Sequence, residues 1–287
     1  MKNAEKAFLI TGATAGIGKA AAIAIAKTGG RVILTSRDAK KGEQVVQEII
    51  NASQNRSIEM VLCDMASLQS VKECAAQCLK KYPKLEVLIN NAGVFETERR
   101  VSQDGIEMTW AVNHLAPFLL TNLLLPALKQ AEEARIITTS SIAHKFIKQI
   151  NFDDVEFKTR FDGNKAYQQS KLANLLFSSH LAKLLKETAI TSNALHPGVI
   201  ATDLYRNFGP VKLFLFKIIS ALVGSPVISV EAGAETTIYL ALDDEVKGVT
   251  GQYFHKKQRL PQSAAAQDPT MAEKLWRVSS DYVKNYL

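Results

Sequence analysis

Tyr167 and Lys171 are the residues whose types and spacing best suit acid–base chemistry. They fall in a predicted helix, where residues four positions apart lie on one face, so the Lys171 ammonium can approach the Tyr167 phenol. A phenol has an ordinary pKa near ~10, and a neighbouring positive charge lowers that pKa by favouring the phenolate. Tyr167 could then exchange a proton with a substrate at neutral pH. Most Tyr/Lys pairs on helices are surface pairs, so the spacing alone does not establish an active site.

A glycine-rich turn at residues 11–18, Thr-Gly-Ala-Thr-Ala-Gly-Ile-Gly, lies between a predicted strand and an alanine-rich helix. Its glycines allow a tight turn and a close approach of backbone amides to a pyrophosphate, and the helix N-terminus adds a partial positive charge. The strand–turn–helix context predicts a dinucleotide site. We expect the turn to bind the cofactor through six residues, which are Gly12, Thr14, Ala15, Gly16, Ile17 and Gly18.

Ser36 and Arg37 end the second predicted strand, about 20 residues beyond the glycines, where an NAD-binding protein would place a carboxylate on the ribose hydroxyls. Ser36 can hydrogen-bond to a 2′-phosphate and Arg37 can pair with it, so the sequence favours NADP(H) over NAD. The plainer interpretation is that Arg37 is a surface residue. Asp38 is expected to cap the next helix in either case.

Two further strand ends supply candidate cofactor contacts. Asp64 and Met65 follow the third strand and can meet the adenine, although Asp64 could equally cap the helix that begins near Ser67. The run Asn-Asn-Ala-Gly at 90–93 ends the fourth strand, where small residues let a cofactor lie close and Asn side chains stabilise the sheet edge. From this run we expect contacts from Asn91, Ala92 and Gly93.

Short β-branched runs alternate with helical patterns along the chain, and this alternation predicts right-handed crossovers and a parallel sheet covered on both faces. We therefore predict an α/β fold, a doubly wound parallel sheet of the Rossmann type. We expect a single domain over residues 1–287, with a cofactor half at about 1–135 and a catalytic half at about 136–260. The predicted strands are Ala7–Thr11, Arg31–Ser36, Ile58–Cys63, Leu85–Asn90, Arg135–Ser140, Thr191–His196 and Gln252–Phe254.

The composition excludes several classes of protein. The 287 residues are 47% hydrophobic and 22% charged, which is typical of a folded chain with a large core. The net charge of +7 comes from lysines mixed with acids, without a basic stripe, so we expect no nucleic-acid partner. Cys63, Cys74 and Cys78 complete no tetrahedral ligand set, so we expect no metal, reduced thiols and a cytoplasmic location. The polar N-terminus, residues 1–6, leads us to expect neither a signal peptide nor a transmembrane anchor.

The motifs occur together in one order along the chain. They are the turn at 11–18, Asn-Asn-Ala-Gly at 90–93, Tyr-x-x-x-Lys at 167–171 and His-Pro-Gly at 196–198, together with Asn113 and Ser141. As a set they resemble the short-chain dehydrogenase/reductase superfamily over nearly the whole length of the chain. The resemblance implies hydride transfer between a nicotinamide and a carbonyl or alcohol carbon.

Residue by residue, the resemblance implies that Tyr167 is the catalytic acid/base and that Ser141 holds the substrate oxygen. Lys171 would bind the nicotinamide ribose and lower the pKa of Tyr167, so both residues also contact the cofactor, and Asn113 would position a water in a proton relay. Two plainer interpretations stay open: Asn113 could bond to the backbone of its own helix, and Ser141 could merely end a strand. The loop after the sixth strand would touch the nicotinamide through Pro197, Gly198, Val199, Ile200 and Thr202.

The interval from Ser141 to Tyr167 is about twice that common in the superfamily, so Lys145–Lys165 is an inserted segment that we expect to shape substrate access. Two further motifs accompany this insertion, namely Ser-Ile-Ala-His at 141–144 and Ala-Glu-Lys-Leu-Trp in the tail at 272–276. Together the three features are similar to the retinol dehydrogenase branch. That branch is also similar to light-dependent protochlorophyllide reductases and a WW-domain-containing oxidoreductase, and its members mostly prefer NADP(H).

An apolar stretch at residues 211–230 is interrupted by Lys212, Lys217 and Gly-Ser-Pro at 224–226, so we predict that it does not span a membrane. Over residues 201–230 we expect a helical apolar lid, which favours a hydrophobic, retinoid-like or lipid-derived carbonyl or alcohol substrate. Peripheral contact of the lid with a membrane stays open, as does its packing in a homo-oligomer.

Two other functions stay open. One is a catalytically inactive nucleotide-binding sensor or scaffold, which is disfavoured because all four catalytic positions carry the required residue types. The other is light-dependent reduction of a tetrapyrrole, which would also require pigment binding.

Overall fold

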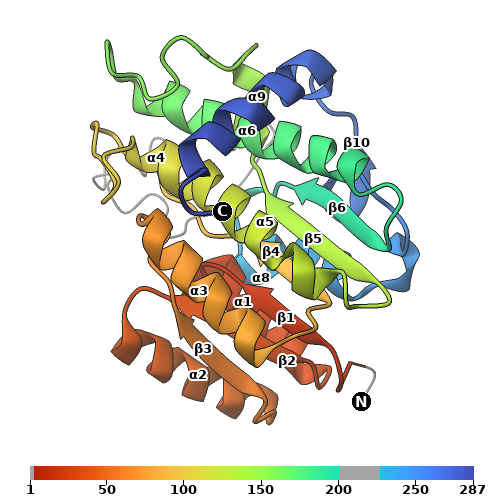
Figure 1. Ribbon diagram of the computed structural model, residues 1–287. Coiled ribbons are helices and arrows are strands. Elements are labelled where there is room, and N and C mark those ends of the chain that lie inside the picture. The colour runs from red at the N-terminus through yellow and green to blue at the C-terminus, as the bar shows by residue number, and fades with distance from the viewer. Residues whose placement is uncertain (1–2, 201–226) are drawn as a thin grey trace.

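In the computed structural model, which describes residues 3–200 and 227–287, eight strands form one sheet in the order β10-β9-β6-β5-β4-β1-β2-β3 (Figure 1). Neighbouring strands pair in parallel, except that β9 and β10 are antiparallel. The chain winds outward from β1 to β3 and then returns to β4 on the other side of β1, which confirms the predicted doubly wound fold. The strands are β1 (Ala7–Ile10), β2 (Arg31–Ser36), β3 (Ile58–Leu62), β4 (Val87–Asn90), β5 (Ala134–Thr139), β6 (Ile190–Leu195), β9 (Tyr253–His255) and β10 (Gln258–Leu260).

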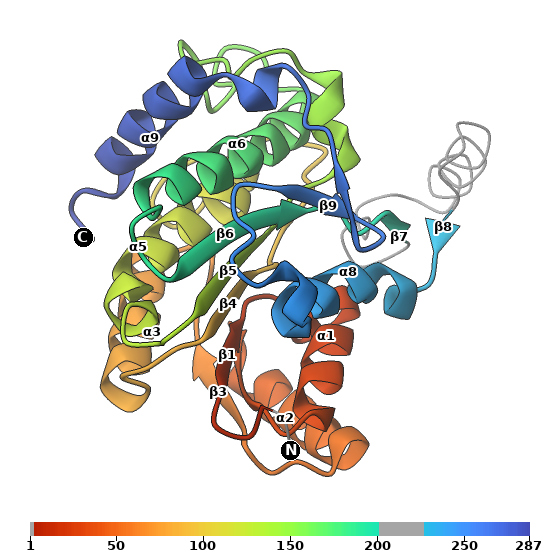
Figure 2. The same cartoon turned by 90° about the vertical axis from the view of Figure 1, so that its right-hand side faces the viewer.

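Helices cover both faces of this sheet, as Figure 2 shows. Alternate strand residues point to opposite faces, so Leu9 packs into the core beneath α3, α5 and α6, whereas Phe8 and Ile10 pack into the core beneath α1, α2 and α8. Both cores are apolar, which explains why the strands read as nearly continuous hydrophobic runs. The helices are α1 (Gly16–Lys27), α2 (Ala39–Ser53), α3 (Leu68–Lys81), α4 (Met108–Trp110), α5 (Ala116–Leu128), α6 (Gly163–Leu184), α8 (Val230–Leu242) and α9 (Pro269–Val283), with 3₁₀ turns at Ile142–Phe146, Asp244–Val246 and Ala265–Gln267.

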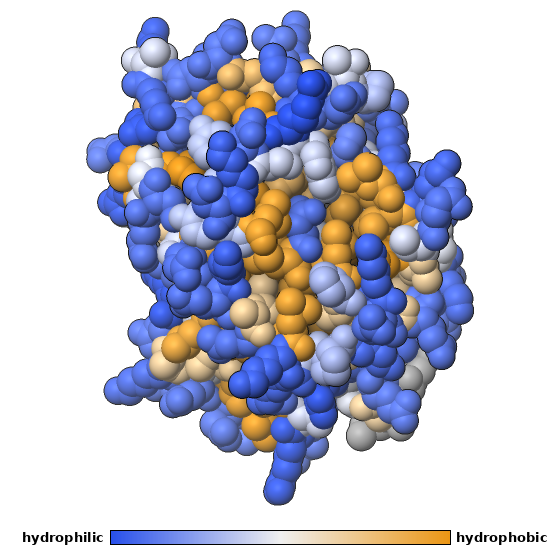
Figure 3. Space-filling model, in the orientation of Figure 1, coloured by the Kyte–Doolittle hydropathy of each residue, from blue (hydrophilic) through white to orange (hydrophobic). Residues whose placement is uncertain are grey.

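A π-helical turn, η1 (Ala111–Leu115), joins α4 to α5 and carries Asn113. The continuous segment Met108–Leu128 is, of the described residues, the one helix long and apolar enough to cross a membrane, with a mean hydropathy of 1.4. However, 78% of its apolar window is buried inside the protein, as in a core helix. Figure 3 shows that, on the face of the molecule seen in Figure 1, some apolar side chains reach the surface near the middle, among polar ones.

Helix α9 packs against α5 and α6 (Figures 1 and 2). The ring of Trp276 lies between the two helices, with its centroid 4.9 Å from that of Phe118 and 6.0 Å from that of Phe177. Large aromatic side chains bury much apolar surface, so this contact fixes the C-terminal helix to α5, which follows the turn that carries Asn113, and to α6, which carries Tyr167.

Three strands differ from the sequence prediction. The seventh predicted strand is followed by a partner, β10, after a two-residue turn at Lys256 and Lys257, whose φ angles are 48° and 63°. Such turns are usually marked by Asn-Gly or Asp-Gly, and lysines gave no such signal. The short strands β7 (Val199–Ile200) and β8 (Val227–Ile228) pair outside the main sheet.

Candidate active site

A cavity of about 760 Å³ lies where the parallel strands end, and the segments that follow β1 to β6 line it. This is the position at which doubly wound sheets bind ligands, because the strand order reverses there. Of the predicted residues, Asn113 and Val199 do not line the cavity, and Thr202 and most of the predicted lid lie outside the described residues. Those that do line it are Gly12, Thr14, Ala15, Gly16, Ile17, Gly18, Ser36, Arg37, Asp64, Met65, Asn91, Ala92, Gly93, Ser141, Tyr167, Lys171, Pro197, Gly198 and Ile200.

The glycine turn has no room for side chains. Gly12 has a φ of 66°, and a Cβ there would lie 2.8 Å from the Ala92 Cα. A Cβ on Gly18 would lie 2.4 Å from the Gly12 carbonyl oxygen. Asn91 holds the turn in place, since its Nδ2 donates to the carbonyls of Thr11 at 3.0 Å and Gly12 at 3.2 Å. Ala15 immediately precedes helix α1 and its side chain cannot cap the helix, so backbone N–H groups at the first turn are available to an anion.

Cationic side chains stand beside the end of β2. Arg37 and Lys41 both line the cavity, and their side chains are exposed. Ser36 is engaged in the local turn, where its hydroxyl donates to the Asp38 carbonyl at 2.7 Å. Asp38 caps α2 as predicted, by accepting from the Lys41 N–H at 2.9 Å. Sequence reasoning missed Lys41, because Lys40 and Lys41 read as an ordinary solvated helix face.

Asp64 faces the cavity and is held by two donors. One carboxylate oxygen accepts from the Ala66 N–H and the other from Gln103 Nε2, both at 3.0 Å. Ser67, and not Asp64, caps α3 by accepting from the Ser70 N–H, so the alternative capping role for Asp64 is wrong. Residues 100–103 also line the cavity. They carry no motif, so the sequence had no signal for them.

Tyr167 and Lys171 lie in the first turns of α6, whose N-terminus is capped by Asp162. The Lys171 Nζ lies 5.5 Å from the centroid of the Tyr167 ring and donates to the Thr139 carbonyl at 3.1 Å. Both side chains are buried, and burial lowers the pKa of Lys171 to about 8. The pair is thus no surface pair: a desolvated ammonium lies beside the phenol at the edge of the cavity.

Asn113 is fully buried and bonds outside its own helix. Its Oδ1 accepts from the Val94 N–H at 2.7 Å, and its Nδ2 donates to the Val94 carbonyl at 2.9 Å and to Ser170 Oγ at 3.0 Å. Asn113 and Lys171 both border Gly93, where a Cβ would lie 3.4 Å from Asn113 Oδ1 and 3.5 Å from Lys171 Nζ. Asn113 therefore joins the segment after β4 to the helix that carries Tyr167.

Ser141 follows β5 by two residues, caps the 3₁₀ turn by accepting from the Ala143 N–H at 3.2 Å, and lines the cavity. Its hydroxyl therefore has a local structural contact as well as access to a ligand. On the other side, Gly198 has a φ of 97° and a Cβ there would lie 2.9 Å from Ile228 Cδ1. The described residues contain no group of three His, Cys, Asp or Glu side chains placed to hold a metal.

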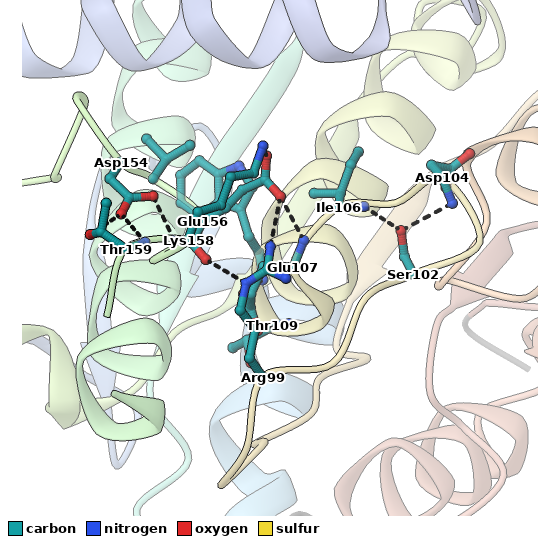
Figure 4. Close-up of polar contacts among 12 residues, drawn as sticks. Arg99, Ser102, Asp104, Ile106, Glu107, Thr109, Asp154, Glu156, Lys158 and Thr159 are labelled. Carbon is teal, nitrogen blue, oxygen red and sulfur yellow. Dashed lines mark hydrogen bonds and ion pairs between the residues drawn. The ribbon is translucent and has the colours of Figure 1, made fainter. Parts of the chain in front are cut away.

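The inserted segment docks through a buried carboxylate, Glu156, which Figure 4 shows facing the segment that leads into α4. Glu156 Oε2 accepts from the Glu107 N–H at 3.0 Å and lies 3.6 Å from Arg99 Nη2. Its other oxygen accepts from the Tyr282 hydroxyl at 2.9 Å and pairs with Lys158 at the same distance. One carboxylate thus holds together the insertion, α9 and the loop that continues into residues 100–103.

Known proteins resemble the chain over almost its whole length. The family model for short chain dehydrogenase matches residues 6–211. The chain is 39% identical to retinol dehydrogenase 13 of Homo sapiens over 280 residues, which cover 97% of this chain and 84% of that protein. It is 40% identical over 280 residues to the chloroplastic short-chain dehydrogenase TIC 32 B of Brassica napus, covering 94% of this chain and 86% of that protein. A solved structure of an uncharacterized protein from Mycobacterium Paratuberculosis has a TM-score of 0.78 and 31% identity, covering 98% of this chain and 94% of that one.

Proposed function

The chain belongs to the short-chain dehydrogenase family, in the branch of the retinol dehydrogenases, and from this premise we propose that it is an NADP(H)-dependent oxidoreductase that interconverts a carbonyl compound and an alcohol on a hydrophobic substrate. Members of this family are oxidoreductases that use NAD(P)(H). The observation that carries the finer proposal is the single cavity that the glycine turn, Arg37, Ser141, Tyr167 and Lys171 line together.

Tyr167 is the proposed acid/base. During reduction its phenol donates a proton to the substrate oxygen while the carbonyl carbon receives a hydride, and during oxidation it takes the proton back. Lys171 stabilises the phenolate through its positive charge, and Ser141 donates a hydrogen bond to the substrate oxygen. Asn113 supports this arrangement by fixing the Val94 backbone and Ser170. NADPH, when bound, supplies the hydride.

The residues at both ends of the cavity fit a dinucleotide phosphate. The crowded glycines and the uncapped start of α1 suit a pyrophosphate, and Arg37 and Lys41 suit a 2′-phosphate. Turnover of NADPH with a panel of aldehydes and ketones tests the function, and Tyr167→Phe should reduce kcat at least ~100-fold. Undiminished turnover by Tyr167→Phe would reject the acid/base role, and a protein that binds NADPH without turnover would be a sensor.

The proposed preference for NADP(H) is tested at Arg37. Arg37→Ala should raise the KM for NADPH at least ~10-fold while changing the KM for NADH little, because only NADPH carries the 2′-phosphate. Equal effects on the two cofactors would reject a 2′-phosphate contact.

A hydrophobic substrate is supported by the apolar side chains of Val94, Val112 and Ile200 in the cavity wall and by the apolar stretch at 211–230. In a series of aldehydes of increasing chain length, kcat/KM should rise by a few-fold per added methylene. A flat series would reject the apolar pocket. The cytoplasmic location stays a prediction, because one similar protein is named as chloroplastic.

A further inference from the structure

Residues 101–103 line the cavity next to Asp64, at the end that the proposed function gives to the adenosine half of the cofactor. Arg37, which we expect to pair with the 2′-phosphate of the adenosine ribose, follows β2, and Asp64 follows β3, the edge strand next to β2. The base attached to that ribose therefore has its place between the end of β3 and residues 101–103. The proposed mechanism gives these three residues no role.

The side chains of residues 101–103 alternate in direction. Val101 is part of an antiparallel bridge, and successive side chains of such an extended segment point to opposite sides. Ser102 is buried, and its hydroxyl oxygen accepts from the N–H groups of Asp104 at 3.2 Å and Ile106 at 3.3 Å (Figure 4). Val101 and Gln103, both exposed, therefore lie on the other side, where they border the cavity.

Val101 and Gln103 suit the two kinds of surface that a purine presents. Val101 is apolar yet 47% exposed, so its side chain can cover the flat face of a base. Gln103 Nε2 donates to Asp64 Oδ2 at 3.0 Å, and it thereby fixes a carboxylate that can accept from the amino group on the edge of an adenine. An apolar wall with a few polar groups at its margin is typical of a small-molecule site.

Hydrogen bonds to two distant segments fix this loop. The Gln103 N–H donates to the Ala66 carbonyl at 2.9 Å. The two carboxylate oxygens of Asp104 accept from the Leu68 N–H at 2.9 Å and from the Tyr286 hydroxyl at 3.0 Å. Tyr286 lies in the turn after α9, 182 positions from Asp104, and neither residue lines the cavity. The turn after α9 is therefore bonded to the loop that borders the adenosine end of the cavity.

We propose that Tyr286 is a positioning residue for nucleotide binding, which holds residues 101–104 in place so that Val101 and Gln103 bind the adenine. This inference rests on the proposed function and deepens it. It makes the affinity for the adenosine half of the cofactor depend on a hydroxyl group outside the cavity.

Loss of the Tyr286 hydroxyl leaves the half-buried Asp104 carboxylate short of one donor. An ionised carboxylate is costly to leave unsatisfied, and water can replace the missing donor when the loop moves outward. The loop then occupies the binding position for only a fraction of the time, and the apparent Kd rises by the inverse of that fraction. Bound nucleotide restores the position, so the chemistry at Tyr167 is unaffected once the cofactor saturates the site.

The test measures the Kd of adenosine 2′,5′-bisphosphate by calorimetry, because this probe carries the adenine and the 2′-phosphate but no nicotinamide. Tyr286→Phe should raise this Kd and the KM for NADPH about three- to tenfold and leave kcat at saturating NADPH unchanged. In an Asp104→Ala background, Tyr286→Phe should have no further effect, because the hydroxyl acts through that carboxylate. Val101→Ser, which removes the apolar wall but not the anchor, should weaken binding of the probe about threefold or more.

Tyr239→Phe is the matched control, since Tyr239 is a half-buried tyrosine on α8 whose hydroxyl donates to the Glu245 carboxylate at 3.2 Å. It should leave the Kd of the probe unchanged. A wild-type Kd in Tyr286→Phe or in Val101→Ser, an equal rise in Tyr239→Phe, or a further rise in the Asp104→Ala background would each overturn the inference. A wild-type protein that binds the probe but turns over no carbonyl compound would reject the proposed function, whereas the Kd series would still decide the role of Tyr286.

Discussion

Replacing Glu156 by glutamine is expected to destabilise the protein, because this carboxylate is the buried acceptor shared by three segments (Figure 4). Glutamine has the same shape and one acceptor oxygen. With that oxygen on the Glu107 N–H, its amide group would present donors to the Tyr282 hydroxyl, which must then accept instead of donate, and to the Lys158 ammonium, which has no acceptor.

The magnitude follows from the contacts that are lost. A hydrogen bond to a charged acceptor contributes about 1.5–3 kcal/mol, and the substitution replaces two such bonds, to the Glu107 N–H and the Tyr282 hydroxyl, by weaker neutral ones. The ion pairs add little, since the Arg99 and Lys158 side chains are 30% and 64% exposed and can be hydrated instead. We expect Glu156→Gln to lower the free energy of unfolding by about 2–4 kcal/mol, which corresponds to a fall in Tm of roughly 5–15 °C.

Urea unfolding followed by circular dichroism measures this loss. Asp154→Asn is the matched control, because Asp154 is a half-buried carboxylate on the same segment that accepts hydrogen bonds from its chain neighbours Lys158 and Thr159. Its effect should be clearly smaller. A Glu156→Gln protein as stable as wild type, or no less stable than Asp154→Asn, would refute the assignment of Glu156 as the anchor of the insertion.

Three further outcomes are expected. Gly18→Ala should weaken NADPH binding at least ~10-fold by calorimetry while the fold is retained, because its Cβ would lie 2.4 Å from the Gly12 carbonyl that shapes the turn. Gly163→Ala should lower the free energy of unfolding by about 1–3 kcal/mol, since its Cβ would lie 2.2 Å from the Glu96 carbonyl oxygen; a variant as stable as wild type would contradict this steric account. Lys171→Met should abolish turnover and yet be more stable than wild type at pH 7, because the pKa of Lys171 is lowered to about 8 in the folded chain. The free energy of unfolding of wild type should therefore rise as the pH increases from about 8 towards the ordinary lysine pKa. Over that pH range the stability advantage of the methionine variant should shrink.

The sequence was most informative where structure depends on neighbouring residues. The parallel strands were predictable because both of their faces are buried, and the Gly12 to Gly18 turn was predictable because its glycines, strand and helix are contiguous. The cap at Asp38 is likewise local.

The features that the sequence did not reveal depend on contacts between distant segments. Glu156 is an ordinary glutamate in the sequence, and only the fold brings it to Tyr282, which lies 126 positions away. Gln103 meets Asp64 in the same way. The turn at Lys256 and Lys257 was missed for a different reason, since lysines seldom adopt a positive φ.

The π-helical turn at Ala111–Leu115 restricts how this segment can vary in length. Such a turn holds one residue more than the corresponding α-helical turn, and an α-helix rotates by about 100° per residue. Deleting any one residue there would restore a regular helix. It would also rotate Asn113 by about 100° relative to the helix on one side of the turn, and so turn its side chain away from Val94 or from Ser170. Substitutions in the turn can therefore be accommodated individually, whereas a single insertion or deletion would separate two binding partners of the same side chain.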